Sequence, residues 1–277
     1  MEAHDFDVLI EAALREDMPA GDVTSESVIL PGAVSEAVLL AKEDGVLAGL
    51  PVARRVFEKI DSRVEFGEEA QDGRPFKKGD TLARLKGPTV ALLKGERTAL
   101  NFLQRMSGIA TATRRFVDAV QGTRTRILDT RKTTPGLRLL EKYAVAAGGG
   151  KNHRMGLSDM VLIKDNHLRH VGSLAEAVRR ARAAVKPGMR VEVETNDLGQ
   201  VREALASGAD MIMLDNMPLE TMREAAALVA GRVPLEASGN MTLERVRAVA
   251  ETGVDYISVG ALTHSVRAVD ISLEFLN

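Results

Sequence analysis

The stretch RVEVETNDLGQVREALASGADMIMLDN, residues 190–216, decides the fold of this chain. Two short aliphatic runs, RVEVE (190–194) and MIMLD (211–215), enclose a helical pattern over residues 198–206. A strand, a helix and a second strand in this order form a right-handed unit whose two strands are parallel. The stretch therefore predicts one βαβ unit of a parallel sheet.

The same alternation extends through the second part of the chain. Further strand-like runs are RILD (126–129), MVLIK (160–164), VPLEAS (233–238) and YISVG (256–260), and helical patterns cover residues 137–147, 174–184, 219–229 and 243–251. No dinucleotide-binding fingerprint accompanies them, which favours a closed or nearly closed barrel over an open doubly wound sheet. Six strands are clear, fewer than the eight of a complete barrel, so closure stays open.

The first hundred residues have a different, α+β pattern. Helical spacing over residues 6–15 and 51–59 alternates with strand-like runs over 36–46, 64–66 and 81–85. A long helical stretch follows from Val90 to about Val120, and we expect Gly108 to divide it into two helices. The predicted domains are therefore an N-terminal domain over residues 1–107 and a barrel domain over residues 108–265.

Composition excludes several classes of protein. With 277 residues, 45% hydrophobic and 27% charged, the chain can bury a core. Its net charge of -2 argues against binding to nucleic acid or to an anionic membrane. It has no cysteine, which excludes disulfides, thiolate zinc sites and cysteine nucleophiles. There is no apolar run of ~18 residues and no signal-peptide pattern at the start, so we expect a cytoplasmic protein.

Polar side chains follow every predicted strand of the second part. The strand ends carry Asp129 to Lys132, Lys164 to His167, Glu194 to Asn196, Asp215 with Asn216, Ser238 to Asn240, and Gly260 with Thr263 and His264. Barrel enzymes place their active sites at this face. Loops after strands are polar in any case, and Asn196 and Thr242 could serve only as helix caps. Capping does not require lysine or arginine, however, so the pattern favours a functional site.

The charges in this cluster indicate the substrate. Arg131, Lys132, Arg154 and Lys164 give four positive charges, with His153 as a fifth candidate. If these groups converge, their mutual repulsion is costly unless a polyanion binds. Glu194 and Asp215 on successive strands would hold a divalent metal or stabilise a developing cation. The alternative is that they only form an ion-pair network with the same cations.

Two glycine-containing strand ends add a phosphate site. Ser238-Gly239-Asn240 and Val259-Gly260-Ala261 follow the last two strands, where backbone N–H groups can cradle a phosphate, although glycine there can also mark a simple turn. The sequence contains no Walker loop, no nucleophile elbow and no metal-binding histidine spacing. The residues alone thus predict a barrel enzyme for multiply anionic substrates, at least one of them a phosphate, with a divalent metal.

Two long motifs carry a resemblance to a known family. DTRKTTPGLR (129–138) and GGGKNHRMGLSDMVLIKDNH (148–167) resemble the quinolinate phosphoribosyltransferase family. Shorter motifs of this family occur in the same order: LREDMPAGDVTS (14–25), GERTALNFLQRMSGIAT (95–111), VEVET (191–195), MLDN (213–216), EASGN (236–240) and SVGALTHS (258–265).

This resemblance implies a reaction and a fold. Quinolinate and phosphoribosyl pyrophosphate would give nicotinate mononucleotide, pyrophosphate and CO2 in NAD biosynthesis, with Mg2+. The fold would be an N-terminal α/β sandwich and an open α/β barrel of about seven strands, with the C-terminal tail over residues 266–277 packing back on the first domain. Members form homodimers or dimer-based hexamers.

The resemblance also implies a role for each candidate residue. Lys132, Lys164, Glu194 and Asp215 would be catalytic, and Glu194 and Asp215 would bind ribose hydroxyls and the magnesium–pyrophosphate, directly or through water. The other roles fall into groups. Arg131, His153, Arg154 and Lys164 would hold the quinolinate carboxylates, Lys132 would hold the phosphoribosyl substrate or pyrophosphate, and Arg97 would enter from the neighbouring subunit. The 5′-phosphate would be cradled by Ser238, Gly239, Asn240, Gly260 and Ala261, and Thr130 and Val259 would bind substrate at positions not assigned further. From sequence alone, Arg97 would be a solvated helix arginine.

Two other functions remain open at this point. A paralogue of the same fold could act on another anionic acceptor, as in the group linked to molybdate transport, although LIKDNH (162–167) is intact here. A non-catalytic metabolite-binding barrel would not need both carboxylates and every cation. Turnover with quinolinate distinguishes the three.

Overall fold

The computed structural model describes residues 6–67 and 70–276. Its contacts divide the chain into two compact units. The first comprises the described residues up to Arg114, the segment Thr133–Gly149 and the residues from Ser265 onward; the second comprises Arg115–Lys132 and Gly150–His264. The units therefore differ in extent from domains divided near residue 107, since one internal segment returns to the first unit.

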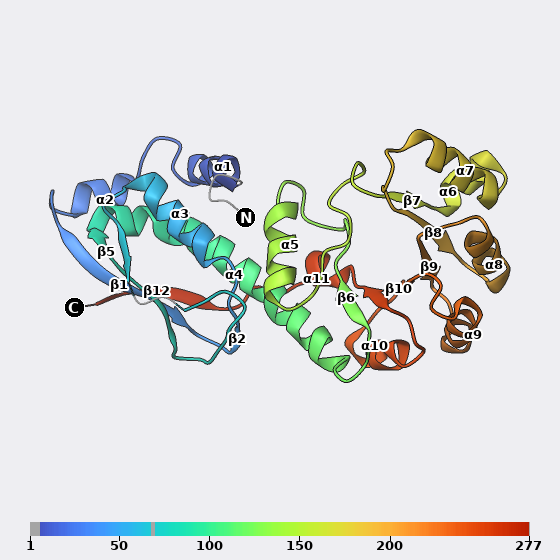
Figure 1. The fold of residues 1–277 in the computed structure, drawn as a ribbon. Helices are drawn as coiled ribbons and strands as arrows, with labels where there is room; N and C mark the ends of the chain where they lie inside the picture. Colours follow the sequence, from blue (N-terminus) through green and yellow to red (C-terminus); the bar gives the residue numbers. More distant parts are fainter. Residues whose placement is uncertain (1–5, 68–69, 277) are drawn as a thin grey trace. The chain divides into compact units, whose positions relative to one another are not determined.

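A four-stranded antiparallel sheet forms the base of the first unit, with the strand order β12-β1-β5-β3 (Figure 1). Its C-terminal strand pairs with β1, with Leu39 opposite Leu273, so that the chain's tail is an edge strand of this sheet. A separate two-stranded sheet holds β2 and β4. The strand bounds are β1 Val34–Ala41, β2 Gly45–Val46, β3 Glu65–Gly67, β4 Pro75–Phe76, β5 Thr81–Pro88 and β12 Ile271–Leu276.

Helices complete the first unit, and two glycines explain its close packing. A Cβ on Gly95 would lie 2.5 Å from Phe57 Cδ1, and one on Gly108 would lie 2.2 Å from the Arg267 carbonyl oxygen. The expectation that Gly108 divides the long helix is wrong, because this glycine makes room for the C-terminal segment within one continuous helix. The helices are α1 Asp7–Asp17, α2 Val23–Val28, α3 Leu50–Ile60, α4 Thr89–Ala119 and α5 Arg138–Ala147.

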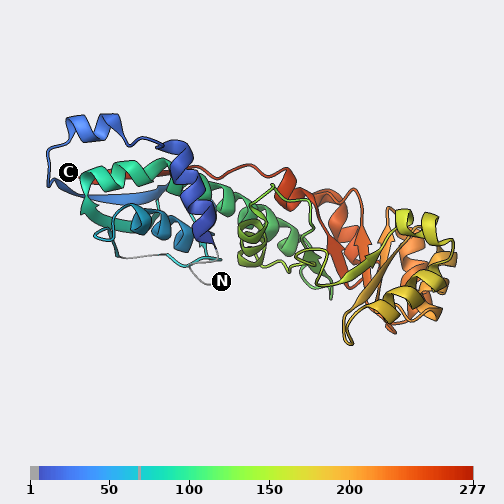
Figure 2. The same ribbon diagram turned by 90° about the horizontal axis from the view of Figure 1, so that it is seen from above.

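The second unit is the predicted parallel β/α repeat (Figure 2). Its six strands follow the order β6-β11-β10-β9-β8-β7, and each neighbouring pair is parallel. Each strand overlaps a run that the sequence predicts, and only β8 extends beyond its run, by one residue. The strand bounds are β6 Arg126–Leu128, β7 Val161–Ile163, β8 Val191–Thr195, β9 Met211–Asp215, β10 Leu235–Ser238 and β11 Tyr256–Ser258.

The barrel of the second unit is open. Among the described residues, β6 and β7 form the two ends of the sheet, and Lys151 adds only an isolated parallel bridge to Leu128 of β6. About seven strands were expected, and the sheet has six among the described residues. Helices α7 to α10 pack beside one another in chain order. The helix bounds are α6 Asp165–Val171, α7 Leu174–Ala184, α8 Leu198–Ala206, α9 Leu219–Val229, α10 Leu243–Ala250 and α11 Ala261–His264.

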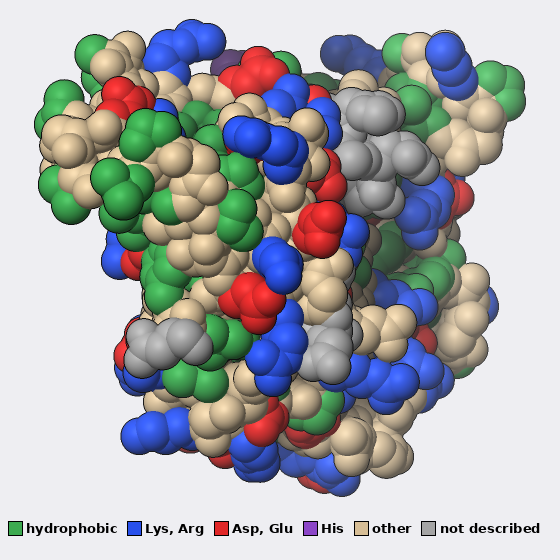
Figure 3. All heavy atoms as spheres, turned by 90° about the vertical axis from the view of Figure 1, so that its left-hand side faces the viewer, with side chains coloured by type: hydrophobic (Ala, Val, Ile, Leu, Met, Phe, Trp, Pro, Cys, Tyr) green, Lys and Arg blue, Asp and Glu red, His purple; other side chains and the backbone are tan. Residues whose placement is uncertain are grey.

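The first unit also carries apolar side chains at its surface. Four of them come from α2, the segment after it and the first residue of β1: Val23, Val28, Leu30 and Val34. Figure 3 shows hydrophobic side chains gathered over part of one face, next to a region of mixed charges. Contiguous exposed apolar surface often marks a protein–protein interface.

Among the described residues, no helix is both long and apolar enough to cross a membrane.

Candidate active site

A cavity of about 620 Å³ lies in the second unit and is lined at the carboxyl ends of its strands. This volume is within the usual range for small-molecule sites. The strands of a parallel sheet end on the same edge, which explains why residues far apart in sequence meet here. The structure brings most predicted site residues into the cavity wall: Thr130, Arg131, Lys132, His153, Arg154, Lys164, Glu194, Asp215, Ser238, Gly239 and Asn240.

Four cationic side chains converge on this cavity. Burial lowers the pKa of the Arg154 guanidinium, and the neighbouring positive charge of Arg131 lowers it further. Both effects mean that the cavity holds its positive charges at a cost, which a bound anion would relieve. Two hydrogen bonds hold the loop after β6. Within the loop, the Lys132 N–H donates to Thr130 Oγ1 (3.0 Å), and from α11 the Thr263 hydroxyl donates to the Lys132 carbonyl (2.8 Å).

The two predicted carboxylates have different surroundings. Glu194 Oε2 lies 2.5 Å from Lys164 Nζ, so this carboxylate already has a cationic partner. Asp215 accepts a hydrogen bond from Asn216 Nδ2 (3.0 Å) and has no cationic partner among the described residues. Carboxylate oxygens are the ligands that Mg2+ prefers. The donor set therefore fits a magnesium ion, with Asp215 as the better-placed ligand.

The backbone is strained where β9 and β10 end at the cavity. Gly239 has a φ of +93°, and two non-glycine residues, Asn216 and Asn240, also have positive φ values of 54° and 48°. Asn240 Nδ2 donates to Asn216 Oδ1 at 3.0 Å, which links the two strained residues. A Cβ on Gly239 would lie 2.2 Å from that same Oδ1. Strain of this kind persists where the surroundings enforce it, and it is frequent at ligand sites.

Four predicted residues are not among those that line the cavity. Arg97 is exposed on α4 of the first unit. Val259 is buried, with 1% of its surface exposed. Gly260 lies beside a cavity residue, because a Cβ there would be 3.1 Å from Lys132 Cδ. Ala261 begins the four-residue helix α11.

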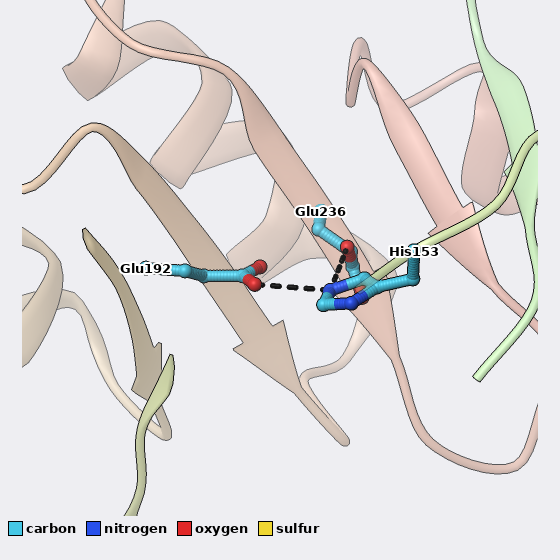
Figure 4. A group of neighbouring side chains, drawn as sticks. All are labelled: His153, Glu192 and Glu236. Carbon is cyan, nitrogen blue, oxygen red and sulfur yellow. Dashed lines mark hydrogen bonds and ion pairs between the residues drawn. The ribbon is translucent and has the colours of Figure 1, made fainter. Parts of the chain in front are cut away.

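Two buried glutamates beside the predicted site residues were not predicted from the sequence. Glu192 on β8 and Glu236 on β10 are fully buried, and both approach the ring of His153 (Figure 4). His153 Nε2 lies 3.0 Å from Glu192 Oε2 and 3.3 Å from Glu236 Oε2. Strand alternation could have found them, because Glu192 shares a face with Glu194 and Glu236 shares one with Ser238.

Burial and charge act in opposite directions on this cluster. Burial raises the pKa of Glu192 and the nearby Glu236 carboxylate raises it further, to about 7. Burial lowers the pKa of His153, but the hydrogen bond with Glu192 and the negative charge of Glu236 at 3.3 Å outweigh burial and raise it overall. The cluster thus keeps a proton near neutral pH that three separate groups in water would have lost.

An open β/α barrel with cations, carboxylates and a strained glycine turn around one cavity defines the class as an enzyme for phosphorylated, anionic substrates. Two family models match the chain: the N-terminal domain of quinolinate phosphoribosyl transferase over residues 22–107, and its C-terminal domain over residues 109–274. The chain belongs to the quinolinate phosphoribosyltransferase family.

Relatives match over almost the whole chain. The probable nicotinate-nucleotide pyrophosphorylase [carboxylating] of Bacillus subtilis is 49% identical and covers 96% of this chain and 92% of its own length. The chloroplastic enzyme of that name from Arabidopsis thaliana is 46% identical over 98% of this chain and 83% of its own. Among solved structures, NadC from Streptococcus pyogenes has a TM-score of 0.96 at 43% identity, covering 100% of this chain and 99% of that one.

Proposed function

We propose that this chain transfers the phosphoribosyl group of phosphoribosyl pyrophosphate to quinolinate, forming nicotinate mononucleotide, pyrophosphate and CO2 for NAD biosynthesis. The observation that carries this proposal is the convergence of Arg131, Lys132, Arg154 and Lys164 on one cavity that also holds Glu194 and Asp215. Quinolinate brings two carboxylates, and phosphoribosyl pyrophosphate brings phosphate and pyrophosphate. Substrates of this charge would offset the repulsion among the cations.

The residues of the cavity suit each step of that reaction. Arg131, Arg154 and Lys164 hold the quinolinate carboxylates and orient the pyridine nitrogen, while Lys132 stabilises the leaving pyrophosphate. The bond from ribose C1 to the pyrophosphate oxygen breaks with its electron pair on oxygen, and Glu194 and Asp215 stabilise the positive character at C1. The nitrogen lone pair then forms the new bond to C1.

Decarboxylation follows from the charge that this bond creates. The ring nitrogen is now positive, so the electron pair left at C2 by departing CO2 lies beside a cation, and C2 then takes a proton. Mg2+, when bound near Asp215, would supply additional positive charge at the pyrophosphate.

The test is an assay for nicotinate mononucleotide and CO2 with each substrate and Mg2+ omitted in turn. We expect product only when both substrates and Mg2+ are present. Binding of phosphoribosyl pyrophosphate without turnover of quinolinate would instead indicate a different anionic acceptor. Binding of both ligands without product would indicate a non-catalytic protein.

The proposal includes a homodimer, or a hexamer built from dimers, in which Arg97 enters the neighbouring subunit's site. The exposed position of Arg97 on α4 supports its entry into a neighbouring site. The apolar side chains at the surface of the first unit support an interface between subunits.

Mixing two inactive variants tests the shared site. R97A and K164A should each be inactive alone. After the subunits are exchanged, half of the dimers are mixed and one site in each is intact, so about a quarter of wild-type activity should return. If Arg97 acts within its own subunit, mixing restores nothing.

A further inference from the structure

The cluster of His153, Glu192 and Glu236 has ring contacts that define the role of the histidine (Figure 4). The Arg154 N–H donates to His153 Nδ1 at 2.7 Å, so this nitrogen acts as an acceptor. Nε2 must then carry the ring proton, which faces Glu192 Oε2 at 3.0 Å and Glu236 Oε2 at 3.3 Å. Both ring nitrogens are therefore engaged by groups of the protein.

We propose that Glu192 and Glu236 are positioning residues that fix the His153 ring and, through its Nδ1, the backbone of Arg154, so that His153 supports the Arg154 cation instead of binding substrate through its own ring. This inference rests on the proposed function and goes beyond it, since neither glutamate was assigned a role and His153 was expected to contact quinolinate.

The surroundings of the histidine favour this fixed role. Its backbone N–H donates to the buried Asp129 Oδ1 at 2.8 Å, and the Arg154 Nη1 donates to the Met160 carbonyl at 3.1 Å. Glu192 approaches from β8 and Glu236 from β10, on either side of β9. The His153–Arg154 segment is thus held at its backbone, at the ring and at the guanidinium, which is how a ligand-binding cation keeps its geometry.

Two other roles of this cluster fit the geometry less well. A metal ion could be suggested, because ligand atoms of the three residues lie within 4.8 Å of one another. However, a histidine that ligates a metal normally donates the N–H of its other ring nitrogen, and here that nitrogen accepts. A second proton on Nδ1, which the two carboxylates favour because they raise the pKa of the ring, would face the Arg154 N–H and break this contact, so the positioning role belongs to the neutral ring.

Two uncharged substitutions separate positioning from charge. In H153Q the amide nitrogen reaches the place of Nε2 and can donate to both glutamates, whereas the shorter side chain of H153N cannot. Calorimetry with quinolinate should give a Kd within about threefold of wild type for H153Q, and one raised about tenfold or more for H153N. E192Q should raise the KM for quinolinate and change kcat less. E220Q, on the exposed face of α9, is the control and should change neither.

Equal losses in H153Q and H153N would overturn the proposal, because a cationic ligand would be lost equally in both. 15N NMR of the histidine ring, recorded above its raised pKa of about 9, is an independent readout: we expect the neutral ring to carry its proton on Nε2 and none on Nδ1, and a neutral ring protonated on Nδ1 would overturn the assignment. Failure of wild type to form nicotinate mononucleotide would refute the proposed function alone, since the NMR result does not depend on turnover.

Discussion

Lys164 Nζ lies 2.5 Å from Glu194 Oε2, so a cation expected to hold quinolinate and a carboxylate expected to face the ribose are paired with each other. Lys164 lies between the end of β7 and the start of α6, and Glu194 lies within the adjacent strand β8. Their side chains are 41% and 11% exposed. The pair neutralises both charges until substrates enter. When the substrates bind, Lys164 and Glu194 must either separate, each to contact its own ligand, or stay paired while both contact the ligands.

The first prediction concerns the loss of one cation. K164A and R131A should each lower kcat/KM at least about 100-fold, because each removes a preorganised charge from the cavity. K164A also leaves Glu194 without its partner, so its loss should include weaker binding of phosphoribosyl pyrophosphate. Steady-state kinetics with each substrate varied would show this. K186A, an exposed lysine outside the cavity wall, is the control, and full activity of K164A and R131A would refute the site assignment.

The barrel could be predicted from sequence because its signal is local and repeated. The run RVEVE and the run MIMLD each became a strand within one or two residues of the expected bounds, and the polar ends of those strands met at one cavity. Strand direction accounts for this success, since parallel strands separated by helices must end at the same edge. The match of the family models supports the assignment independently.

Features that depend on distant contacts could not be predicted. Gly108 reads as a helix break in sequence, but it accommodates the Arg267 carbonyl, which only the tertiary structure reveals. Strand alternation places Glu192 and Glu236 on the same face as predicted site residues, but only the approach of His153 shows that they form a buried cluster. The return of residues 133–149 to the first unit likewise has no local signal.

The second prediction concerns the strained turn after β10. G239A should raise the KM for phosphoribosyl pyrophosphate at least about tenfold, since a Cβ at this φ of +93° would collide with Asn216 and displace the backbone N–H groups of the turn. G208A is a matched control, because Gly208 also has a positive φ of 78° but open space around its Cβ position. Both variants carry the same kind of backbone strain. Equal KM values in the two would show that the turn does not bind phosphate.

The third prediction concerns acid stability. The hydrogen bonds of Arg55 and then Lys59 hold the pKa of Asp7 well below its usual value of 3.8. A depressed carboxyl pKa stabilises the fold above the pKa of the unfolded chain, and this stabilisation is lost as pH falls through the folded value. D7N should therefore have a lower unfolding temperature than wild type at pH 7, and the difference should shrink below about pH 3.8. A difference that is constant with pH would mean that the ion pairs contribute nothing.

The fourth prediction separates the two carboxylates by their need for magnesium. Asp215 has no cationic partner among the described residues, whereas Glu194 is paired with Lys164, so D215N should weaken metal binding more than E194Q does. We expect D215N to raise the Mg2+ concentration for half-maximal rate about tenfold, while E194Q mainly lowers kcat. Magnesium titrations at saturating substrates measure both effects, and Mn2+ binding followed by electron paramagnetic resonance gives a readout without turnover. If E194Q shows the larger magnesium shift, the ion pair with Lys164 opens when substrates bind, and Glu194 becomes the metal ligand.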